Sequence, residues 1–422
     1  MVTRLFTILF AIAFLIYPTF SQVFVEKQTR HRFAQNSMGF DFQNGVGGHT
    51  FFQNRNGQVE KLDINGTTVP RIVLGGLHFW GHADFYIAIP LRVSSFESNN
   101  QEITYSSGVE TVFKYYPWQL ESKKIRPYIG LSVTPYRYKQ DNFNLEFSGG
   151  QNLYHVSVPL MSGITYLRNN KQFELGVTWN YNNEQEYYLN RTDIRSISTN
   201  PLYITAALKF VFDTTIGLEE AWESGRQQEK TKKLAEQGEL NGFFIGAGLS
   251  SAWWMGESTY NTNTRPFIQG YGNSIMGDFA IGYYLHNPDI NIAVNYRKYG
   301  KSIDVYGAFH SLKRRSYGLE ATKYITDYNG FDAFIGPIIT YEKLNFSESF
   351  ERNLTQKKEL TQINWGITFG WDIRPDRMQT IILRTSLRWF PSLNLDIDDS
   401  SSISFENIEF NFIQLVIFPN RF

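Results

Sequence analysis

The sequence predicts an all-β protein that crosses a membrane as an antiparallel up-and-down β-barrel of about 16 strands, on three observations. Short segments alternate apolar with polar or small residues, as in 173–181 (FELGVTWNY) and 365–372 (WGITFGWD). The connections between such segments are alternately short and long. Aromatic residues make up 16% of the chain, although its mean hydropathy is −0.32. Strand side chains alternate between two faces, so each segment offers one face to lipid and the other to a lumen.

The bulk composition excludes several classes of protein. The chain of 422 residues has 40 basic and 40 acidic side chains, so its balanced charge gives no sign of a nucleic-acid surface. It has no cysteine, which excludes a disulfide scaffold, a thiolate metal site and a cysteine nucleophile. Beyond the N-terminus no apolar run is long enough for a membrane-spanning helix. We expect no cofactor and no bound metal.

Residues 1–21 fit a cleavable signal peptide. Arg4 forms a short basic region, 5–20 is apolar with Pro18 near its end, and Thr19 and Ser21 are small residues at the expected cleavage positions. Export together with alternating strands predicts location in the cell outer membrane of a Gram-negative bacterium. Residues 22–45 are expected to form an N-terminal extension ahead of the first strand.

The expected strands fall into two groups of eight. The first unit, 46–213, has candidate strands at 46–53, 70–80, 83–93, 104–116, 125–137, 153–168, 171–182 and 200–213. The second unit, 241–422, has them at 242–254, 276–286, 290–299, 315–326, 330–343, 362–373, 378–390 and 406–419. The tight turns of the second unit are 286–289, 327–330 and 374–377, and long loops lie at 255–275, 300–314, 344–361 and 391–405. Short turns of such barrels are periplasmic and long loops extracellular.

The segment 214–240 between the two units differs from both. It is rich in Glu, Gln, Lys and Ala, which are good helix formers, and it carries many charges. We therefore expect a charged, solvated periplasmic helix that links the units.

Each unit resembles the eight-stranded outer-membrane barrels of the outer-membrane protein A and X type. The resemblance rests on 127–130 (PYIG), on the closing-type strand 201–212 (PLYITAALKFVF) and on the C-terminal run 412–422. That run looks like the assembly signal of the family, with Phe418 and the terminal Phe422, although Pro419 interrupts it. The resemblance implies recognition by the barrel-assembly machinery and contact with outer-membrane lipid and lipopolysaccharide.

The strands could close as one barrel of 16 or as two tandem barrels of eight. Both ends of each unit face the periplasm, so the last strand of the first unit could pair with the first strand of the second; we favour this single barrel. It would be a porin-like passive channel for small hydrophilic solutes. Two narrow, filled barrels would instead form a non-conducting membrane scaffold or adhesin that acts through extracellular loops. Nothing in the sequence determines the oligomeric state, and a homo-oligomer is compatible with it.

Two sets of side chains are candidates for function. Charges expected to face the lumen could set ion selectivity in a wide barrel, or neutralise one another in a narrow one: Asp84, Arg92, Glu174, Lys209, Arg297, Asp372, Arg384 and Arg388. Tryptophans near strand ends are expected to form aromatic girdles at the membrane boundaries: Trp80, Trp118, Trp179, Trp253, Trp254, Trp371 and Trp389.

An enzymatic role is not expected. His155 and Ser157 stand on one face of a strand, as in the His-x-Ser pair of outer-membrane phospholipase A. The residues that follow, Val158 and Pro159, do not match that family, and the parity of the strand directs the pair into the lumen. An ordinary polar pair in the lumen explains these residues.

Overall fold

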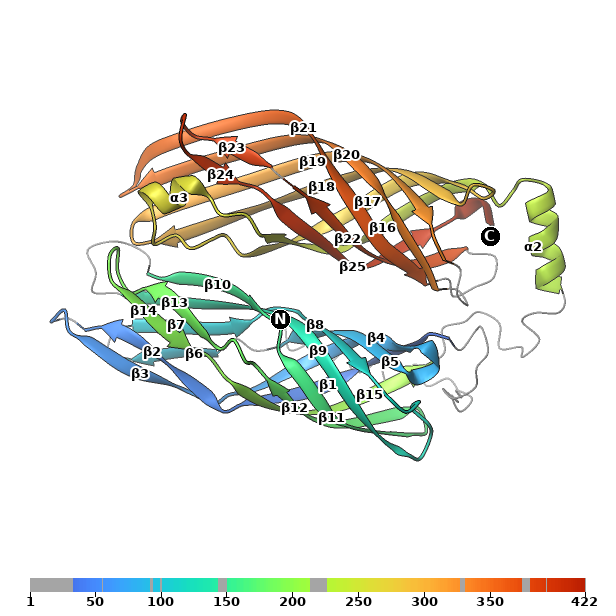
Figure 1. Cartoon of the computed structure of the whole chain (residues 1–422), viewed down its shortest axis with the longest axis horizontal. Helices are drawn as coiled ribbons and strands as arrows, with labels where there is room; N and C mark the ends of the chain where they lie inside the picture. Colours follow the sequence, from blue (N-terminus) through green and yellow to red (C-terminus); the bar gives the residue numbers. More distant parts are fainter. Residues whose placement is uncertain are drawn as a thin grey trace, which may run out of the picture.

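The computed structural model describes residues 33–422 apart from 55, 92–93, 99–100, 143–149, 213–225, 327–330, 374–379, 392 and 422. Its strands build two closed barrels that lie side by side with their axes roughly parallel (Figure 1). The signal peptide 1–21 and the turns 327–330 and 374–377 lie outside the described residues. No helix in the described part of the chain combines the length and apolar character needed to cross a lipid bilayer.

The first barrel is a ring of eight antiparallel strands. In order around the wall they are β1 (Gln35–Gly45), β4 (Thr68–His78), β5 (Ala83–Pro90), β8 (Glu110–Tyr115), β9 (Ile125–Asn142), β11 (Leu160–Arg168), β12 (Lys171–Trp179) and β15 (Leu202–Phe212). The ring closes because β15 pairs with β1 along its whole length, from Asn36 opposite Phe212 to Gly45 opposite Tyr203. The short 3-10 helix η2 (Phe79–Gly81) makes the turn between β4 and β5.

The second barrel is also a ring of eight. Its strands are β16 (Gly242–Trp254), β17 (Asn273–Leu285), β18 (Ile290–Val305), β19 (Ala308–Tyr324), β20 (Phe331–Phe350), β21 (Asn353–Ile373), β22 (Ile381–Phe390) and β25 (Asn407–Ile417). The pairing of β16 with β25 closes it, with Ile245 opposite Ile417. The 3-10 helix η3 (Pro419–Arg421) follows β25.

The all-β barrel class and the sixteen wall strands are confirmed, and the strand pairing settles how those strands are divided. The favoured single barrel would need β15 to pair with β16, but β15 pairs with β1 and β12. The two tandem barrels, our alternative, are therefore the structure. The physical reason is that β1 supplies the partner that satisfies the free edge of β15 within the first unit.

Strand β1 corrects our boundaries for the first unit. We assigned it to the extension 22–45, and we took 46–53 for the first wall strand. Segment 47–53 is instead β2 (Gly47–Gln53), part of a four-stranded sheet beyond the wall. In β1, Met38, Phe40 and Phe42 are exposed at every second residue, so the same alternating pattern is present there.

Additional strands extend both barrels at the end opposite the short turns. The rim of the first barrel contains β2, β3 (Val59–Asn65), β6 (Ser94–Ser98), β7 (Gln101–Ser107), β10 (Asn152–Ser157), β13 (Glu184–Tyr188) and β14 (Ile194–Ser198). The rim of the second contains α3 (Thr259–Thr264), β23 (Asn394–Asp396), β24 (Ser402–Ser404) and the outer ends of β18 to β21. Our expected loops 300–314 and 344–361 are thus mostly strand, with tight turns at Tyr306–Gly307 and Glu351–Arg352.

The linker contains the expected charged helix. Helix α2 (Arg226–Glu236) lies at the end where the short turns are, beside the start of the second barrel (Figure 1). Short turns face the periplasm in barrels of this kind, so α2 is on the periplasmic side and both rims are extracellular.

Candidate functional site

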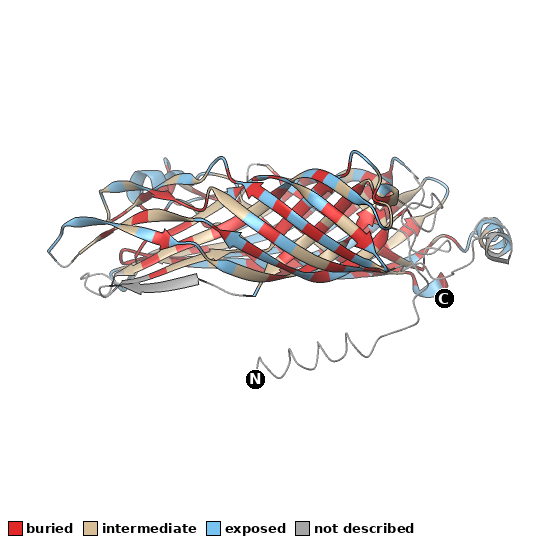
Figure 2. Cartoon of the chain, turned by 90° about the horizontal axis from the view of Figure 1, so that it is seen from below, coloured by how far each residue is buried: buried red, intermediate tan, exposed pale blue. Residues whose placement is uncertain are grey.

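The burial pattern of both walls is inverted relative to that of a water-soluble protein. Buried and exposed residues alternate along β19, and along β21 from Ile363 to Ile373. Alternation of this kind gives the barrel wall a chequered appearance (Figure 2). The exposed positions of the wall include many large apolar residues, such as Ile281, Val294, Leu319 and Ile339, whereas charged residues fill the interior. An apolar outer surface around a closed ring of strands is stable only against lipid. The chain is a membrane-spanning β-barrel protein of the outer-membrane type.

The interior of the first barrel is closed by two buried ion-pair groups. Arg71 pairs with Asp41, with Nε–Oδ1 at 2.7 Å and Nη2–Oδ2 at 2.6 Å, and also contacts Glu110. In the second group Glu174 lies between two lysines: Nζ of Lys114 is 2.6 Å and Nζ of Lys209 is 3.0 Å from its carboxylate. Lys209 also pairs with Asp84. Every one of these side chains is buried, so each charge is satisfied by a partner from another strand.

Four arginines close the interior of the second barrel in layers. Nearest the periplasm, Arg384 pairs with Asp372 at 2.8 Å. In the middle, Arg388 reaches Asp278 at 2.5 Å and Glu320 at 2.9 Å. Nearest the outside, two arginines join two glutamates: Arg297–Glu409 at 2.9 Å, Arg314–Glu342 at 2.6 Å and Arg314–Glu409 at 3.7 Å.

Aromatic rings fill space around these arginines. The guanidinium of Arg384 lies 5.0 Å from the ring centre of Phe334, and that of Arg314 lies 4.7 Å from that of Phe390. The buried rings of Phe244 and Phe418 are 5.5 Å apart below them. Interiors of eight-stranded barrels are just wide enough for side chains to fill them. Here bulky arginines, carboxylates and phenyl rings do so at several levels along the axis.

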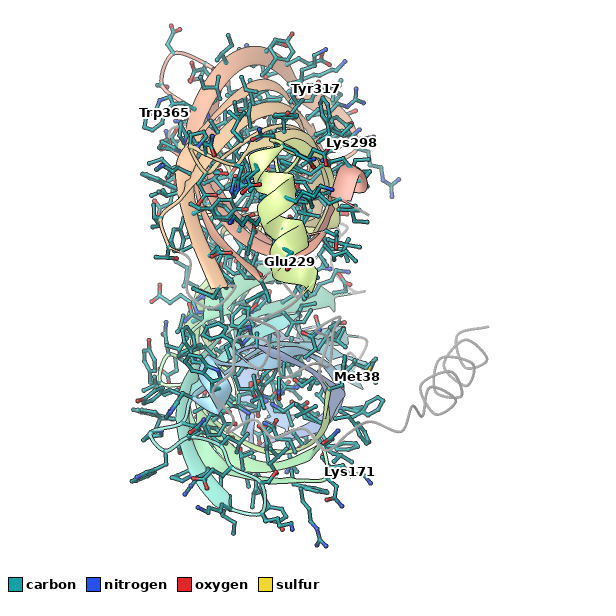
Figure 3. All side chains as sticks on the ribbon, turned by 90° about the vertical axis from the view of Figure 1, so that its right-hand side faces the viewer. Met38, Lys171, Glu229, Lys298, Tyr317 and Trp365 are labelled. Carbon is teal, nitrogen blue, oxygen red and sulfur yellow. The ribbon has the colours of Figure 1, made fainter. Side chains whose placement is uncertain are left out.

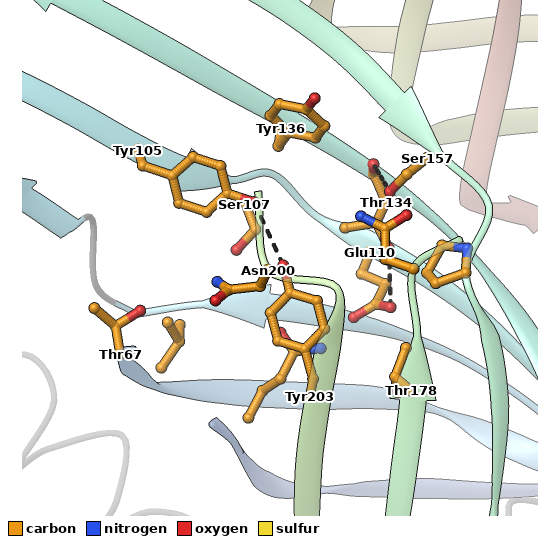
Figure 4. A pocket seen from close by; sticks show the side chains of 14 residues that line it. Thr67, Tyr105, Ser107, Glu110, Thr134, Tyr136, Ser157, Thr178, Asn200 and Tyr203 are labelled. Atoms are coloured by element: carbon orange, nitrogen blue, oxygen red, sulfur yellow. Dashed lines mark hydrogen bonds between the residues drawn. The ribbon is translucent and has the colours of Figure 1, made fainter. Parts of the chain in front are cut away.

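A small pocket lies at the outer mouth of the first barrel, above Glu110 (Figure 4). Thr134 donates a hydrogen bond of 2.9 Å to Glu110, and Tyr105, Tyr136 and Tyr203 form much of the lining. The cavity volume is about 30 Å³. A buried water needs about 10–15 Å³, so the pocket has room for about two waters.

Three polar groups of this pocket lack a hydrogen-bond partner among the described residues. The hydroxyl of Tyr136, Oγ1 of Thr178 and Oδ1 of Asn180 are buried and make no hydrogen bond with any described residue. Buried polar groups are normally paired, and ordered water is the usual partner where protein groups are out of reach. The pocket thus has the size and polarity to hold water, and it is too small for a whole sugar or amino acid.

The rim of the second barrel is a packed cap. Its apolar core joins residues of α3, the outer strands and the segment 393–405, including Tyr260, Ile303, Phe346, Leu393 and Phe405. Beside that core, His310 donates from Nε2 to the carboxylate of Glu348 at 3.2 Å, because a carboxylate can only accept. The other ring nitrogen, Nδ1, then accepts from the hydroxyl of Tyr271 at 3.0 Å.

This polar cluster of the cap has shifted titrations. It lies beyond the level where outward side chains of the wall become charged, so it is outside the membrane-spanning segments. Burial lowers the pKa of His310. Burial opposes ionisation of Glu348, but hydrogen bonds from His310 and Tyr260 outweigh that effect and lower its pKa to about 2.

The two rims contact each other through specific polar bonds. Arg191 of the first rim donates from Nη2 to the carbonyl of Tyr306 at 2.8 Å and pairs with Glu351 at 3.1 Å. Tyr306 in turn donates to the carbonyl of Tyr188 at 2.8 Å. A side-chain bond of 2.9 Å joins Gln151 to Gln269.

A second contact between the rims involves a partly buried lysine. Lys301 of β18 donates to the hydroxyl of Tyr154 at 2.7 Å. Burial, and to a smaller extent repulsion from Arg137, lowers the pKa of Lys301 to about 8. At the periplasmic end the barrels touch through rings instead, with Phe85 5.7 Å from Trp371 and Phe79 5.6 Å from Phe331.

The structure brings together most of the charges that the sequence singled out for the lumen. Asp84, Glu174 and Lys209 lie in the first barrel, and Arg297, Asp372, Arg384 and Arg388 in the second, all buried. Arg92 lies outside the described residues. Sequence reasoning missed several of their partners: Asp41, Arg71, Glu110, Lys114, Asp278, Arg314, Glu320, Glu342 and Glu409. The parity of each strand could have identified those within strands that we had assigned.

The tryptophans occupy more varied positions than a girdle. Trp118, Trp179 and Trp389 are exposed, and Trp253 lies beside Phe410. Trp254 instead packs inward between Tyr271 and Tyr299, because it shares the inward face of β16 with Phe244, Ser250 and Ala252. Trp371 faces the first barrel, and Trp80 packs against Phe33. Trp365, which we had not included, is 58% exposed and points away from the second barrel (Figure 3).

The remaining predicted residues are placed as follows. Phe418 is buried beside Phe244 and Tyr284, while Phe422 lies outside the described residues. Ser157 lines the pocket, and the ring of His155 is 5.3 Å from that of Tyr136. Among the described residues, no three His, Asp or Glu side chains are grouped so that they could hold a metal ion.

Comparison with known proteins adds only distant likenesses. No family model and no curated protein matches the chain. Among solved structures, Neisserial surface protein A is 14% identical with a TM-score of 0.29, and the similarity covers 42% of this chain and 96% of that one. The attachment invasion locus protein of Yersinia pestis is 11% identical, with a TM-score of 0.25 and the same coverage. An outer membrane channel from Pseudomonas putida F1 is 7% identical over 91% of this chain and 94% of its own, with a TM-score of 0.22. Likenesses this weak distinguish neither a channel from a scaffold nor one ligand from another.

Proposed function

We propose that this protein is a non-conducting outer-membrane anchor that holds a composite binding surface outside the cell, as a scaffold or adhesin. The observation that carries the proposal is the set of ion pairs that crosses both lumens, from Arg71–Asp41 to Arg314–Glu342. It favours our alternative function over the porin-like channel, because a permeant solute would have to break several buried pairs in sequence.

The energetics of the lumen argue in the same direction. Breaking one buried ion pair typically costs about 3–5 kcal/mol, since the partner is left as an uncompensated charge. The second barrel carries pairs at three levels along its axis, at Arg384, Arg388 and Arg314. The pocket of the first barrel is too narrow for solutes larger than water. These features argue against diffusion of hydrophilic nutrients through either lumen.

The rims support the second half of the proposal. Extended strands carry each rim well beyond the wall, and each rim has its own apolar core. The bonds between Arg191 and Tyr306 and between Gln151 and Gln269 join the rims into one surface.

Further aspects of the proposal come from the sequence. Apolar alternation in β25 supports recognition by the barrel-assembly machinery, and the apolar outer wall supports contact with outer-membrane lipid, including lipopolysaccharide. We propose no enzymatic role, since Ser157 hydrogen-bonds only weakly to the Thr134 carbonyl, at 3.4 Å, and His155 has no described carboxylate partner.

Conductance of the reconstituted protein tests the closed lumens. The full chain is inserted into planar bilayers, and a sixteen-stranded porin reconstituted in the same way is the positive control. We expect no conductance steps from this protein under conditions in which the porin conducts. Stable steps that shift in ion selectivity when Arg384 or Arg388 is replaced by Glu would restore the channel hypothesis.

Cysteine cross-linking tests the composite surface, because the natural chain has no cysteine. Oxidation of a Gln151→Cys/Gln269→Cys variant should join the rims, so that the two halves remain linked on a denaturing gel after the linker is cut. The matched control is Gln151→Cys/Glu229→Cys, which pairs the first rim with helix α2 at the other end. Equal yields from both variants would contradict the specific rim contact.

A further inference from the structure

The outer wall of the second barrel carries a marker of the extracellular membrane boundary. Tyr296, Tyr317 and Tyr341 lie directly opposite one another on β18, β19 and β20, with ring centres 5.1 and 6.5 Å apart. All three are exposed, and Tyr317 points outward from the wall (Figure 3). Tyrosines gather where hydrocarbon meets headgroups, so this row sits at the interface.

Below this row the same strands present hydrocarbon-facing residues. Val294, Leu319 and Ile339 form the next outward row toward the periplasm, again directly opposite one another. They are exposed on the wall and apolar, which suits contact with acyl chains.

Beyond the tyrosines lies a row of cations. Lys298, Arg315 and Lys343 are direct cross-strand neighbours two residues above the tyrosine row, and Lys313 follows one row further out. All four are exposed. We call Lys298, Arg315 and Lys343 the basic row.

The basic row lacks acidic partners. None of its three residues forms an ion pair with another described residue, and neither does Lys313, although the named arginines of the lumen all do. The neighbouring acid on β21, Glu359, lies opposite Asn345 and pairs with Lys357 at 3.5 Å. Like charges directly opposite each other across strands are unfavourable, so an anion from outside the chain would stabilise this arrangement.

We propose that the basic row binds the phosphate of an outer-leaflet lipid whose acyl chains lie against Val294, Leu319 and Ile339. The planar guanidinium of Arg315 can bind two phosphate oxygens at once, while the flanking ammonium groups of Lys298 and Lys343 supply point charges. The tyrosine row between the cations and the apolar wall matches the level at which a lipid changes from headgroup to chain. A phosphorylated glycolipid such as lipid A has this chemistry. The proposal rests on the membrane orientation used for the proposed function, but it does not depend on whether the lumens conduct.

Lipid retention by the purified full-length protein tests this site. Protein in mild detergent is titrated with bisphosphorylated lipid A, and bound lipid is counted by native mass spectrometry. We expect at least a tenfold loss of affinity in the Lys298→Gln/Arg315→Gln/Lys343→Gln variant. The control is Lys323→Gln, which removes an exposed cation from β19, the strand of Arg315, at the periplasmic interface. This change should leave the affinity for lipid A unchanged.

The ligand arms separate the alternatives. Dephosphorylated lipid A should bind the unchanged protein no more tightly than bisphosphorylated lipid A binds the triple variant. Inorganic phosphate at equal concentration should not displace the bound bisphosphorylated lipid. Equal binding of both lipids would overturn the phosphate site, and displacement by free phosphate would overturn the commitment to a lipid. If the triple variant does not fold, judged by its heat shift on a semi-native gel, Arg315→Gln is compared with Arg315→Lys. Conduction together with intact lipid binding would contradict the proposed function but would still support this lipid site.

Discussion

Arg384 and Asp372 face each other across β22 and β21 inside the second barrel, joined by two parallel hydrogen bonds of 2.8 Å, from Nε to Oδ1 and from Nη2 to Oδ2. The hydroxyl of Tyr324 donates to the same carboxylate. Both charged groups are buried, so the pair is neutral as a unit and costly to divide.

Removing one partner of this pair should destabilise the second barrel strongly. We expect Arg384→Gln to lower the free energy of unfolding by about 3–5 kcal/mol, because Asp372 then keeps a buried charge without a cation. Urea unfolding of the protein in lipid vesicles measures the change.

An exposed pair provides the matched control for that loss. Lys357 and Glu359 form an ion pair of 3.5 Å on the outer part of β21, where both side chains are mostly exposed. Lys357→Gln should cost at most about 1 kcal/mol, since water screens the pair. Similar losses at the two sites would show that the lumen pair is not buried as described.

Cutting the linker should yield two independent barrels. A protease site placed just before α2 (Arg226–Glu236) is cleaved in the folded, detergent-solubilised protein. Because each wall closes on itself through β1–β15 and β16–β25, we expect each fragment to keep its own heat-dependent mobility shift on an unboiled gel. A single barrel sharing one wall would instead lose its shift on separation of the fragments.

Local alternation was enough to predict most of the wall strands, as β16 shows. The sequence predicts a strand at 242–254, and the structure has one at Gly242–Trp254. Each wall strand has one apolar and one polar face, and this period of two survives in the sequence without tertiary information. The same reasoning placed Glu174, Arg297 and Arg388 inside a lumen.

The division into barrels could not be predicted in this way, because it depends on pairing between distant segments. Whether β15 meets β1 or β16 decides between two barrels and one, and both partners show the same alternating pattern. The register is equally non-local: parity directs Asp41 and Arg71 inward, but only the alignment of β1 with β4 sets them opposite each other. Trp254, in contrast, could have been placed by parity, since it shares the inward face of β16 with Phe244 and Ala252.

Tryptophan fluorescence should distinguish lipid-facing from cap residues. Brominated lipids quench indoles that touch acyl chains, so Trp365→Phe, at a position 58% exposed on the wall, should remove part of the quenching. Trp254→Phe should leave the quenched fraction unchanged, because Trp254 lies against Tyr299 in the cap. A loss of quenching in the Trp254→Phe variant would show that Trp254 contacts lipid, as expected of a girdle residue.

Acid should loosen the cap of the second barrel, beginning near the ordinary pKa of histidine. The pKa of His310 is lowered in the folded cap, so the opened cap binds a proton more readily once the pH falls below about 6.5. The free energy that keeps the cap closed then falls by at most about 1.4 kcal/mol per pH unit. The pKa of Glu348 is lowered to about 2, so its contribution to the stability of the cap is complete above the ordinary carboxyl pKa and is lost as the pH falls from about 4.5 toward 2.

Hydrogen exchange across Thr259–Thr264, corrected for the intrinsic pH dependence, should show opening that increases from pH 7.5 to 5. His310→Gln should abolish this increase, because Gln can both donate to Glu348 and accept from Tyr271 without titrating. His82→Gln, in a periplasmic turn, should leave it intact, and an increase that persists in His310→Gln would assign the effect to another group.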